Sequence, residues 1–115
     1  MRRGDIYLVE LEPALGSESN KTRPAVIVSN NAANDSAVRR GRGVVAVVPL
    51  TRNLRNVFAF QVLLLPDDSG LALDSKAQAE QVRAVSTDRL VRQIGTVTAE
   101  RMGELDDALR LHLSL

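Results

Sequence analysis

The 115-residue sequence has no cysteine, no tryptophan and a single histidine, His112. Without cysteine the chain can form no disulfide, no zinc–thiolate site and no thiolate nucleophile. One histidine cannot provide the histidine pair that acid–base cleavage of RNA can use. His112 falls in the last turn of a predicted terminal helix, where a favourable interaction with the helix dipole is the simpler interpretation. Catalytic chemistry must therefore come from other side chains.

Aromatic residues and long apolar runs are also scarce. Tyr7, Phe58 and Phe60 are the only aromatic residues, which argues against a broad base-stacking platform of the kind found in RNA-recognition folds. The longest apolar run, residues 44–50, is far shorter than the roughly 20 residues that a membrane span needs. Asp5 interrupts the apolar region that a signal peptide would require. We therefore expect a soluble, cytoplasmic protein with no membrane partner.

The net charge is small, and motifs for cofactors are missing. A formal charge of +1 argues against general binding to polyanions, so contact with nucleic acid needs locally concentrated positive charge. The sequence has no P-loop, no dinucleotide fingerprint and no histidine–carboxylate cluster with metal-ligand spacing. We therefore expect no cofactor and no metal. Positive charge is concentrated in two groups, which are Arg39, Arg40 and Arg42, and Arg52 and Arg55.

Hydrophobic patterning predicts a single domain, residues 1–115, of mainly β (α+β) class. The predicted strands cover residues 4–11, 23–29, 43–50, 58–65, 77–85 and 93–97, with an exposed loop at 13–22 and a turn at 66–70. A short helix is expected at 30–40, capped by Asn30 or Asn31, and a terminal helix follows Thr98. Its predicted apolar face consists of Met102, Leu105, Leu109 and Leu113. Short strands closed by one helix predict a small, strongly curved barrel.

The segment from Gly16 to Asn30 has the most distinctive chemistry. It places the carboxylate of Glu18 a few residues before Arg23, which is predicted to open the second strand, with Pro24 at the strand's start. The planar guanidinium of arginine suits a phosphate and can stabilise the extra charge of a pentavalent transition state. A polar loop followed by an arginine at the start of a strand explains the same pattern. The residues alone leave both interpretations open.

Two further groups of polar residues follow predicted strands or interrupt them. Thr51 and Asn53 come directly after the apolar strand at 43–50, where they could project from one rim of a barrel or simply form a strand-ending turn. Glu80, Gln81 and Arg83 lie within the predicted strand at 77–85. Polar groups there must find a partner or face a groove, so structural pairing and substrate contact both remain open.

Three ordered blocks resemble the MazF/PemK (Kid-like) family of toxin–antitoxin endoribonucleases. The blocks are RRGDIYLVELEPALGSESNKTRPAVIVSN, then VVAVVPLT, then KAQAEQVRAVSTDRL followed by IGTVT. The first block is specific, and together with the terminal helix the resemblance covers nearly the whole chain. It implies an SH3-like small β-barrel (CcdB/Kid-like) with a short helix after the second strand and a C-terminal helix. It also implies a homodimer.

The resemblance further implies an activity, a partner and site residues. Such enzymes cleave single-stranded RNA, often mRNA, without metal and leave 2′,3′-cyclic phosphate and 5′-hydroxyl ends. A cognate antitoxin with an acidic C-terminal segment neutralises them. The motifs match Arg23 and Thr51 to the catalytic arginine and the catalytic Ser/Thr, and Glu18 to a loop carboxylate that could act as base. The residues that fall where the family contacts RNA are Ser19, Asn20, Lys21, Asn53, Gln81 and Arg83.

Some features set this chain apart from its relatives and from alternative functions. Several relatives carry Gly or Gln where this chain has Ser19, Asn20 and Lys21, so a relative's cleavage sequence should not be transferred. A CcdB-like gyrase poison uses an aromatic residue near the C-terminus, whereas this chain ends in LRLHLSL. A non-catalytic RNA-binding barrel is the other alternative. The presence of Arg23 and Thr51 together argues against it.

Overall fold

The computed structural model describes residues 1–12 and 21–115 of the chain. Its strands are β1 (Asp5–Glu12), β2 (Lys21–Ile27), β3 (Val44–Thr51), β4 (Gln61–Leu64), β5 (Ser75–Gln78), β6 (Arg83–Ser86) and β7 (Leu90–Thr96). Its helices are α1 (Asn31–Arg40), α2 (Pro66–Ser69) and α3 (Ala99–Leu113), with single 3₁₀ turns η1 (Ala79–Gln81) and η2 (Thr87–Arg89). The mainly β, α+β class predicted from the sequence is therefore confirmed.

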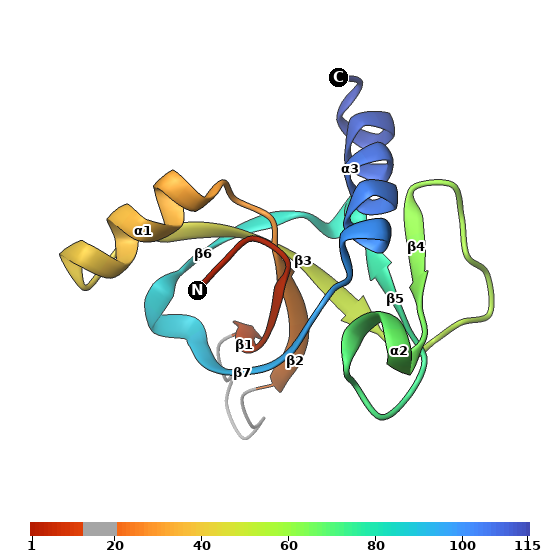
Figure 1. Cartoon of the computed structure of the whole chain (residues 1–115), viewed down its shortest axis with the longest axis horizontal. Coiled ribbons are helices and arrows are strands. Elements are labelled where there is room, and N and C mark those ends of the chain that lie inside the picture. Colours follow the sequence, from red (N-terminus) through yellow and green to blue (C-terminus); the bar gives the residue numbers. More distant parts are fainter. Residues whose placement is uncertain (13–20) are drawn as a thin grey trace.

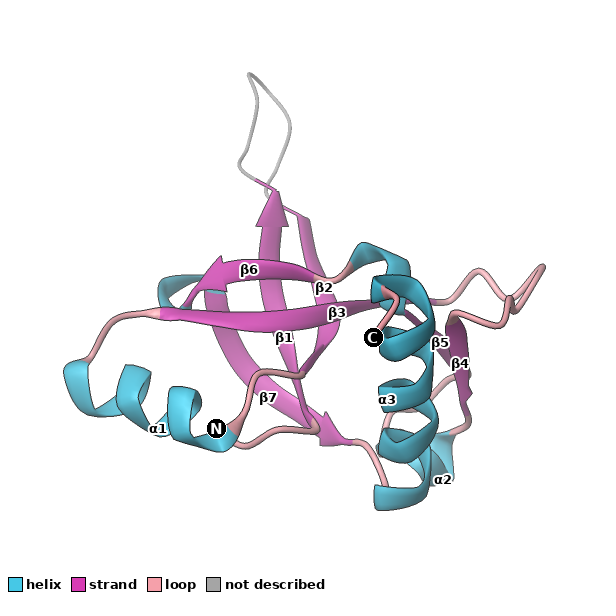
Figure 2. Cartoon of the chain, turned by 90° about the horizontal axis from the view of Figure 1, so that it is seen from above, coloured by secondary structure: helices cyan, strands magenta, loops and turns pink. Residues whose placement is uncertain are grey.

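The strands form one antiparallel, strongly curved sheet in the order β4-β5-β3-β2-β1-β7, and β6 pairs with β3. β5 and β6 lie along the same edge of β3, because residues 50–51 of β3 pair with β5 and residues 44–47 pair with β6. Within the described residues no pairing joins β6 to β7, so the barrel-like sheet is not closed. α1 lies at one end of the sheet and α3 at the other (Figures 1 and 2).

Two apolar clusters hold the sheet and the helices together. Alternate residues of a strand point to opposite faces, so the consecutive apolar residues of β2 and β3 supply both clusters. Val26 and Val48, which are paired across the two strands, join the cluster beneath α3. Ile27 and Val47, the next pair, join the cluster beneath α1, which includes Ala37. This double burial explains why β2 and β3 read as nearly continuous apolar runs.

Several strand boundaries differ from those expected. The expected strand at 77–85 is divided into β5 and β6 by the η1 turn, and the expected strand at 58–65 shortens to β4, which leaves Phe58 and Phe60 outside it. β2 begins at Lys21, so Pro24 lies inside the strand and the expectation that it sits at the start was wrong. The proline is tolerated because the β2–β3 pairing runs from Ala25, so the missing N–H breaks no bond to β3.

The helices agree more closely with the sequence analysis. The Asn30 side chain accepts a hydrogen bond from the Ala33 N–H at 2.8 Å and caps α1, and Thr98 caps α3. The turn expected at 66–70 is the short helix α2. On α3 the apolar face differs from the expectation at its end, because Ala108 is buried whereas Leu113 is 48% exposed. The last turn of α3 therefore extends beyond the sheet.

Candidate active site

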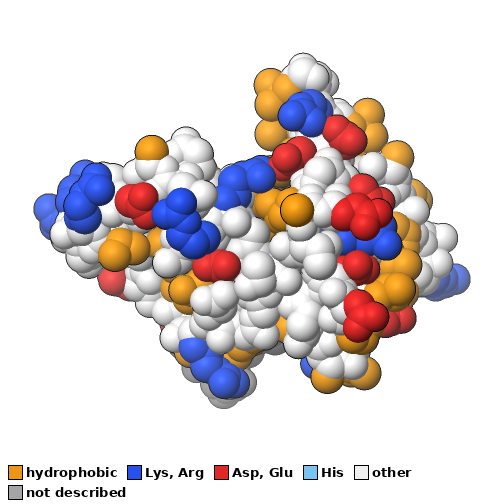
Figure 3. Space-filling model, in the orientation of Figure 1, with side chains coloured by type: hydrophobic (Ala, Val, Ile, Leu, Met, Phe, Trp, Pro, Cys, Tyr) orange, Lys and Arg blue, Asp and Glu red, His pale blue; other side chains and the backbone are white. Residues whose placement is uncertain are grey.

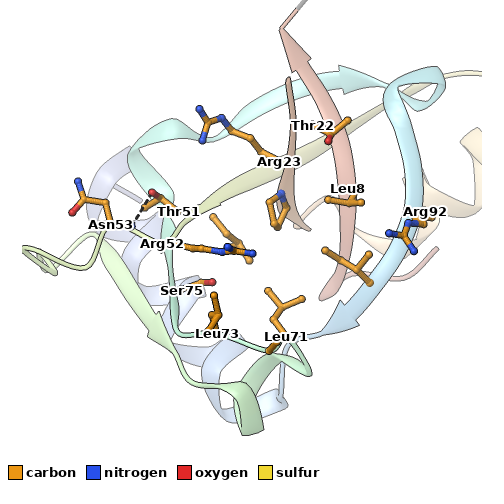
Figure 4. Close-up of a pocket in the computed structure, with 14 residues that line it drawn as sticks. Leu8, Thr22, Arg23, Thr51, Arg52, Asn53, Leu71, Leu73, Ser75 and Arg92 are labelled. Carbon is orange, nitrogen blue, oxygen red and sulfur yellow. Dashed lines mark hydrogen bonds between the residues drawn. The ribbon is translucent and has the colours of Figure 1, made fainter. Parts of the chain in front are cut away.

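Arg23 and Thr51 are brought together by the register of β2 and β3. Arg23 and Thr51 lie two residues beyond Ala25–Pro49, the last pair of the two strands at this end, and both residues line the same two hollows. Arg23 is exposed and Thr51 is partly buried. Figure 4 shows both at one rim of the sheet. The two residues that the motifs single out as catalytic therefore line the same hollows, although they are 28 positions apart in the chain.

Two hollows meet at this pair. The first, called here the mouth groove, has a volume of about 320 Å³ and is lined by Leu11, Arg23, Thr51, Gln78, Gln81 and Arg83. The second, called here the lateral cavity, has a volume of about 570 Å³. Its lining includes Leu8, Pro24, Arg52, Leu71, Leu73 and Arg92, together with Arg23 and Thr51. Arg23 and Thr51 thus stand on the boundary between the two hollows, where a bound chain could pass from one to the other.

The charge of the site is one-sided. The described residues that line the two hollows include four arginines and no carboxylate. By contrast, acidic residues gather on α2 and α3, and the ion pairs formed within the described part of the chain involve Arg2, Arg3, Arg101 and Arg110. Figure 3 shows acidic side chains over the α2–α3 side and basic ones over α1. Although the net charge is small, the acidic and basic side chains lie on different parts of the surface, and the site is positively charged.

The segment after β3 is held by a series of short polar contacts. The Thr51 hydroxyl oxygen accepts a hydrogen bond from the Asn53 N–H at 3.2 Å, and the Asn53 side-chain oxygen accepts one from the Arg55 N–H at 3.2 Å. Lys76, which is paired with Thr51 across β3 and β5, is buried and its ammonium donates to the Asn56 carbonyl. These contacts fix where Asn53 leaves the strand, at the edge of the lateral cavity.

Two arginines, one from β6 and one from η2, donate hydrogen bonds to the end of β1. Arg83 donates to the carbonyl oxygen of Leu11 at 2.9 Å, and Arg89 donates to the carbonyl oxygen of Glu10 at 3.0 Å. The β1–β2 register shifts between Glu10 and Glu12, which marks a β-bulge at Leu11. Bulges disrupt the ladder locally and re-aim the chain. The two guanidinium groups supply partners for carbonyls at this irregular point.

Glu80 and Gln81 separate in the structure, although they are adjacent in sequence. The η1 turn directs Gln81 to the mouth groove, whereas one carboxylate oxygen of Glu80 accepts a hydrogen bond from the Gln61 side-chain amide at 2.7 Å. The other carboxylate oxygen of Glu80 is buried without a hydrogen-bond partner among the described atoms. Of the two interpretations left open for Glu80, structural pairing is the one that the contacts support.

The remaining predicted site residues divide into two sets. Arg23, Thr51, Asn53, Gln81 and Arg83 line the two hollows. Lys21 is the first residue of β2, two positions before Arg23, and it is paired with Glu12 of β1. Glu18, Ser19 and Asn20 lie outside the described residues, as does most of the loop expected at 13–22.

The lining residues that the sequence analysis missed include Arg92, Leu71 and Leu73. Arg92 of β7 is paired with Leu8 of β1, and Leu71 and Leu73 come from the turn that follows α2. Arg92 lies outside the three polar groups that were singled out, and only its tertiary position distinguishes it from other exposed arginines. Two of the three residues are leucines that would ordinarily be assigned to the core. No local signal in the sequence identifies any of them.

No group of three or more His, Cys, Asp or Glu side chains within residues 1–12 and 21–115 is arranged to hold a metal ion. None of the helices in this part of the chain has the length and apolar character needed to cross a membrane.

Comparison with known proteins places this chain in a family. Residues 2–113 match the model of the PemK-like, MazF-like toxin of type II toxin–antitoxin systems. The chain is 56% identical over 115 residues to a protein named Endoribonuclease MazF9 from Mycobacterium tuberculosis, with all of this chain and 98% of that protein covered.

Solved structures agree. An endoribonuclease in complex with its cognate antitoxin, from a mycobacterial species, superposes with a TM-score of 0.78 at 29% identity, covering 100% of this chain and 96% of that one. A MazE–MazF structure from Deinococcus radiodurans has a TM-score of 0.81 at 22% identity, covers 100% of this chain and 96% of that one, and supports the fold. With residues 2–113 matched to the family model and 56% identity to a relative over the whole chain, the chain belongs to the PemK-like, MazF-like toxins of type II toxin–antitoxin systems.

Proposed function

We propose that this toxin is a metal-independent endoribonuclease that cleaves single-stranded RNA, including mRNA, and leaves 2′,3′-cyclic phosphate and 5′-hydroxyl ends. One observation carries the proposal most directly. Arg23 and Thr51 both line two hollows whose described linings contain arginines and no carboxylate. A polyanion that passes from one hollow to the other would bring a phosphate to this pair. Relatives of this chain are named endoribonucleases, which supports RNA cleavage as its activity.

The chemistry needs little from the protein, because RNA carries its own nucleophile. In the proposed reaction the ribose 2′-oxygen forms a bond to phosphorus and loses its proton to a base. The bond from phosphorus to the 5′-oxygen breaks, and that oxygen takes up a proton. The guanidinium of Arg23 stabilises the added negative charge on the phosphoryl oxygens. We propose stabilisation as its main role because a guanidinium group is a very weak acid and gives up its proton poorly.

The other site residues have supporting roles in the proposal. Thr51 orients a non-bridging phosphate oxygen with its hydroxyl hydrogen, since the hydroxyl oxygen already accepts the Asn53 N–H. Glu18 is the proposed base. Ser19, Asn20, Lys21, Asn53, Gln81 and Arg83 are proposed to contact the RNA strand on either side of the cut.

We also propose a partner and an assembly. A cognate antitoxin would cover the positive hollows with an acidic C-terminal segment, for which Arg52 and Arg92 offer charge complementarity. The arginines at the end of α1 offer a second positive surface. The toxin is further proposed to be a homodimer that acts in the cytoplasm, where its RNA substrate is found.

The test is cleavage of a long single-stranded RNA in EDTA by the wild-type protein and by Arg23→Ala. We expect discrete cleavage by the wild type that survives the chelator, and a loss of about 100- to 1,000-fold or more in rate for the variant. Arg2→Ala is the matched control, because it removes the same charge from an exposed ion pair with Asp35, outside both hollows. Dependence on added metal, or equal cleavage by Arg23→Ala, would refute the proposal.

A second substrate tests the chemical path. A single 2′-deoxy residue on the 5′ side of the cut removes the proposed nucleophile, so cleavage there should stop while binding continues. Cleavage at the deoxy position would show that water or another group attacks phosphorus, and the cyclic-phosphate path would be abandoned.

A further inference from the structure

The turn from α1 to β3 carries three arginines that the proposed cleavage reaction does not use. Arg39 and Arg40 end α1, and Arg42 follows after one glycine. The three residues are called here the basic turn. All of them are exposed, and none lines the mouth groove or the lateral cavity. The positive charge of the basic turn is therefore separate from the charge around Arg23 and Thr51.

The backbone of the basic turn is held by two glycines and two hydrogen bonds. Gly41 ends α1 with a left-handed φ of 69°, and its N–H donates to the Val38 carbonyl at 3.1 Å. The Gly43 carbonyl accepts a hydrogen bond from the Thr87 N–H at 3.0 Å, which joins the turn to η2. A Cβ atom at Gly43 would lie only 3.0 Å from the Ala37 Cβ, so glycine lets the turn pack closely against α1. The arginines are therefore carried by a well-defined piece of backbone.

The charge of the basic turn is not neutralised by neighbouring acids. The one acidic residue of α1, Asp35, is paired with Arg2 at 2.9 Å. Within the described part of the chain, the ion pairs involve arginines other than the three of the basic turn. Figure 3 shows basic side chains gathered over the end of α1. The basic turn is therefore free to bind an anionic partner.

The basic turn lies at the end of α1 that points away from α3 (Figures 1 and 2). The protein measures 37 × 33 × 28 Å. At the spacing of about 3.4 Å per stacked nucleotide, a strand of about 11 nucleotides is as long as the largest of these dimensions. A long RNA held at Arg23 and Thr51 can therefore also reach the basic turn, whereas an RNA that only fills the two hollows cannot.

We propose that the basic turn is a second RNA-binding surface, which holds phosphates of the substrate strand at a distance from the cut. This inference rests on the proposed function. Exposed guanidinium groups bind phosphates through charge and hydrogen bonds, without reading the bases. The basic turn would thus increase affinity for long RNA of any sequence and leave the choice of the cleaved sequence to the cleavage site.

The antitoxin is the other candidate for this surface. A protein segment needs pockets for its anchoring side chains in addition to charge. The groove next to the basic turn is formed by α1, η2 and the first strand, and the carboxylate-bearing residue Asp88 is part of its lining. A carboxylate there repels an acidic segment, whereas phosphates can bind the projecting arginines without entering the groove. The observations therefore favour RNA.

The test is RNA binding by two variants of the basic turn. In one, Arg39, Arg40 and Arg42 are all changed to Gln, and in the other all three are changed to Lys. Both are made in the Arg23→Ala protein, so that the probe stays intact. The probes are fluorescein-labelled single-stranded RNAs of mixed sequence, one of about 30 nucleotides and one of about five. Fluorescence anisotropy gives Kd at KCl concentrations from about 0.05 to 0.2 M.

We expect the glutamine variant to lose affinity for the long RNA only. Each phosphate contact with a single strand contributes about 0.7 to the slope of log affinity against log salt, so the slope should decrease by about 2. The corresponding loss at 0.15 M salt is about 50-fold. The lysine variant keeps the charge and should stay within about threefold of its Arg23→Ala parent. Arg110→Gln is a further control, because it removes an exposed arginine of α3 and should leave the slope unchanged.

Two results would overturn the inference. One is an unchanged salt slope for the glutamine variant, and the other is an equal loss of affinity for the long and the short RNA. The same glutamine changes are also made in protein that retains Arg23. If that protein cleaves long RNA as the wild type does but is inhibited less by the cognate antitoxin, the basic turn binds the antitoxin and the inference is wrong.

The binding experiment separates this inference from the proposed function. If the wild-type protein cleaves no RNA, the proposed function fails, but the basic turn is still tested because the binding assay requires no cleavage. If the wild type cleaves RNA and the glutamine variant binds long RNA as its parent does, only the inference fails. The three positions are exposed and glutamine is a good helix former, so the melting temperatures of the variants should match those of their parents.

Discussion

The guanidinium of Arg83 donates a hydrogen bond of 2.9 Å to the carbonyl oxygen of Leu11, 72 positions away in the chain. Leu11 is the bulge residue at the end of β1, opposite the start of the strand that carries Arg23. Arg89 repeats the contact one residue earlier, on the Glu10 carbonyl. Two side chains from the β6–η2 region thus determine how β1 ends beside the site.

Arg89 allows a test of this arrangement, because it lines neither hollow. Arg89→Met should lower kcat of RNA cleavage by about 10-fold and change KM by less than about 2-fold. A hydrogen bond from a charged group contributes about 1.5–3 kcal/mol, and a loss of about 1.4 kcal/mol in the positioning of the site corresponds to a tenfold lower rate. Arg89→Lys, which keeps a donor, should recover part of the loss. A raised KM with unchanged kcat would instead assign Arg89 to direct contact with RNA.

The contribution of Thr51 to RNA cleavage is expected to come from its hydroxyl group and not from its methyl group. Thr51→Ala removes the acceptor of the Asn53 N–H and the proposed phosphate contact together, so cleavage should fall by about 10- to 100-fold. Thr51→Ser keeps the hydroxyl and should stay within a few-fold of the wild type. Single-turnover kinetics at saturating protein would measure both. Equal loss in the two variants would show that packing of the methyl group is what matters.

Lys76 is expected to hold the segment after Thr51 in place. Its buried ammonium donates to the Asn56 carbonyl, and Met at this position keeps the length of the side chain without the donor. Lys76→Met should therefore increase amide hydrogen exchange in residues 53–60 while exchange in β1 and β2 is unchanged. Unaltered exchange in residues 53–60 would mean that the Thr51–Asn53–Arg55 contacts suffice.

Packing of α3 on the sheet should dominate stability. Leu105 is 1% exposed within the cluster that joins α3 to β2 and β3, and Leu105→Ala should lower the free energy of unfolding by about 2–5 kcal/mol. Leu111, on the same helix, is 56% exposed, and Leu111→Ala should change it by no more than about 0.5 kcal/mol. Urea denaturation would measure both. A large loss for Leu111→Ala would reveal that another surface covers the end of α3.

Much of the local structure could be predicted because its causes are local. Asn30 and Thr98 cap helices through bonds within three residues, and the apolar runs of β2 and β3 are visible in any short window. The boundaries that were wrong depend on distant partners. The break between β5 and β6 is one example, because it depends on how that segment follows the single edge of β3.

The active-site chemistry was already limited by composition. With no cysteine and one histidine at the far end of α3, the available groups were arginine, lysine, hydroxyl and carboxylate, and the motif around Arg23 pointed to the family. The fold alone decided three relationships: that Thr51 and Arg23 line the same hollows, that Leu8 is paired with both Pro24 and Arg92, and that Arg83 donates a hydrogen bond to Leu11. The physical reason is that strand register and long-range hydrogen bonds join segments tens of residues apart. No local pattern of residues encodes which of those segments will meet.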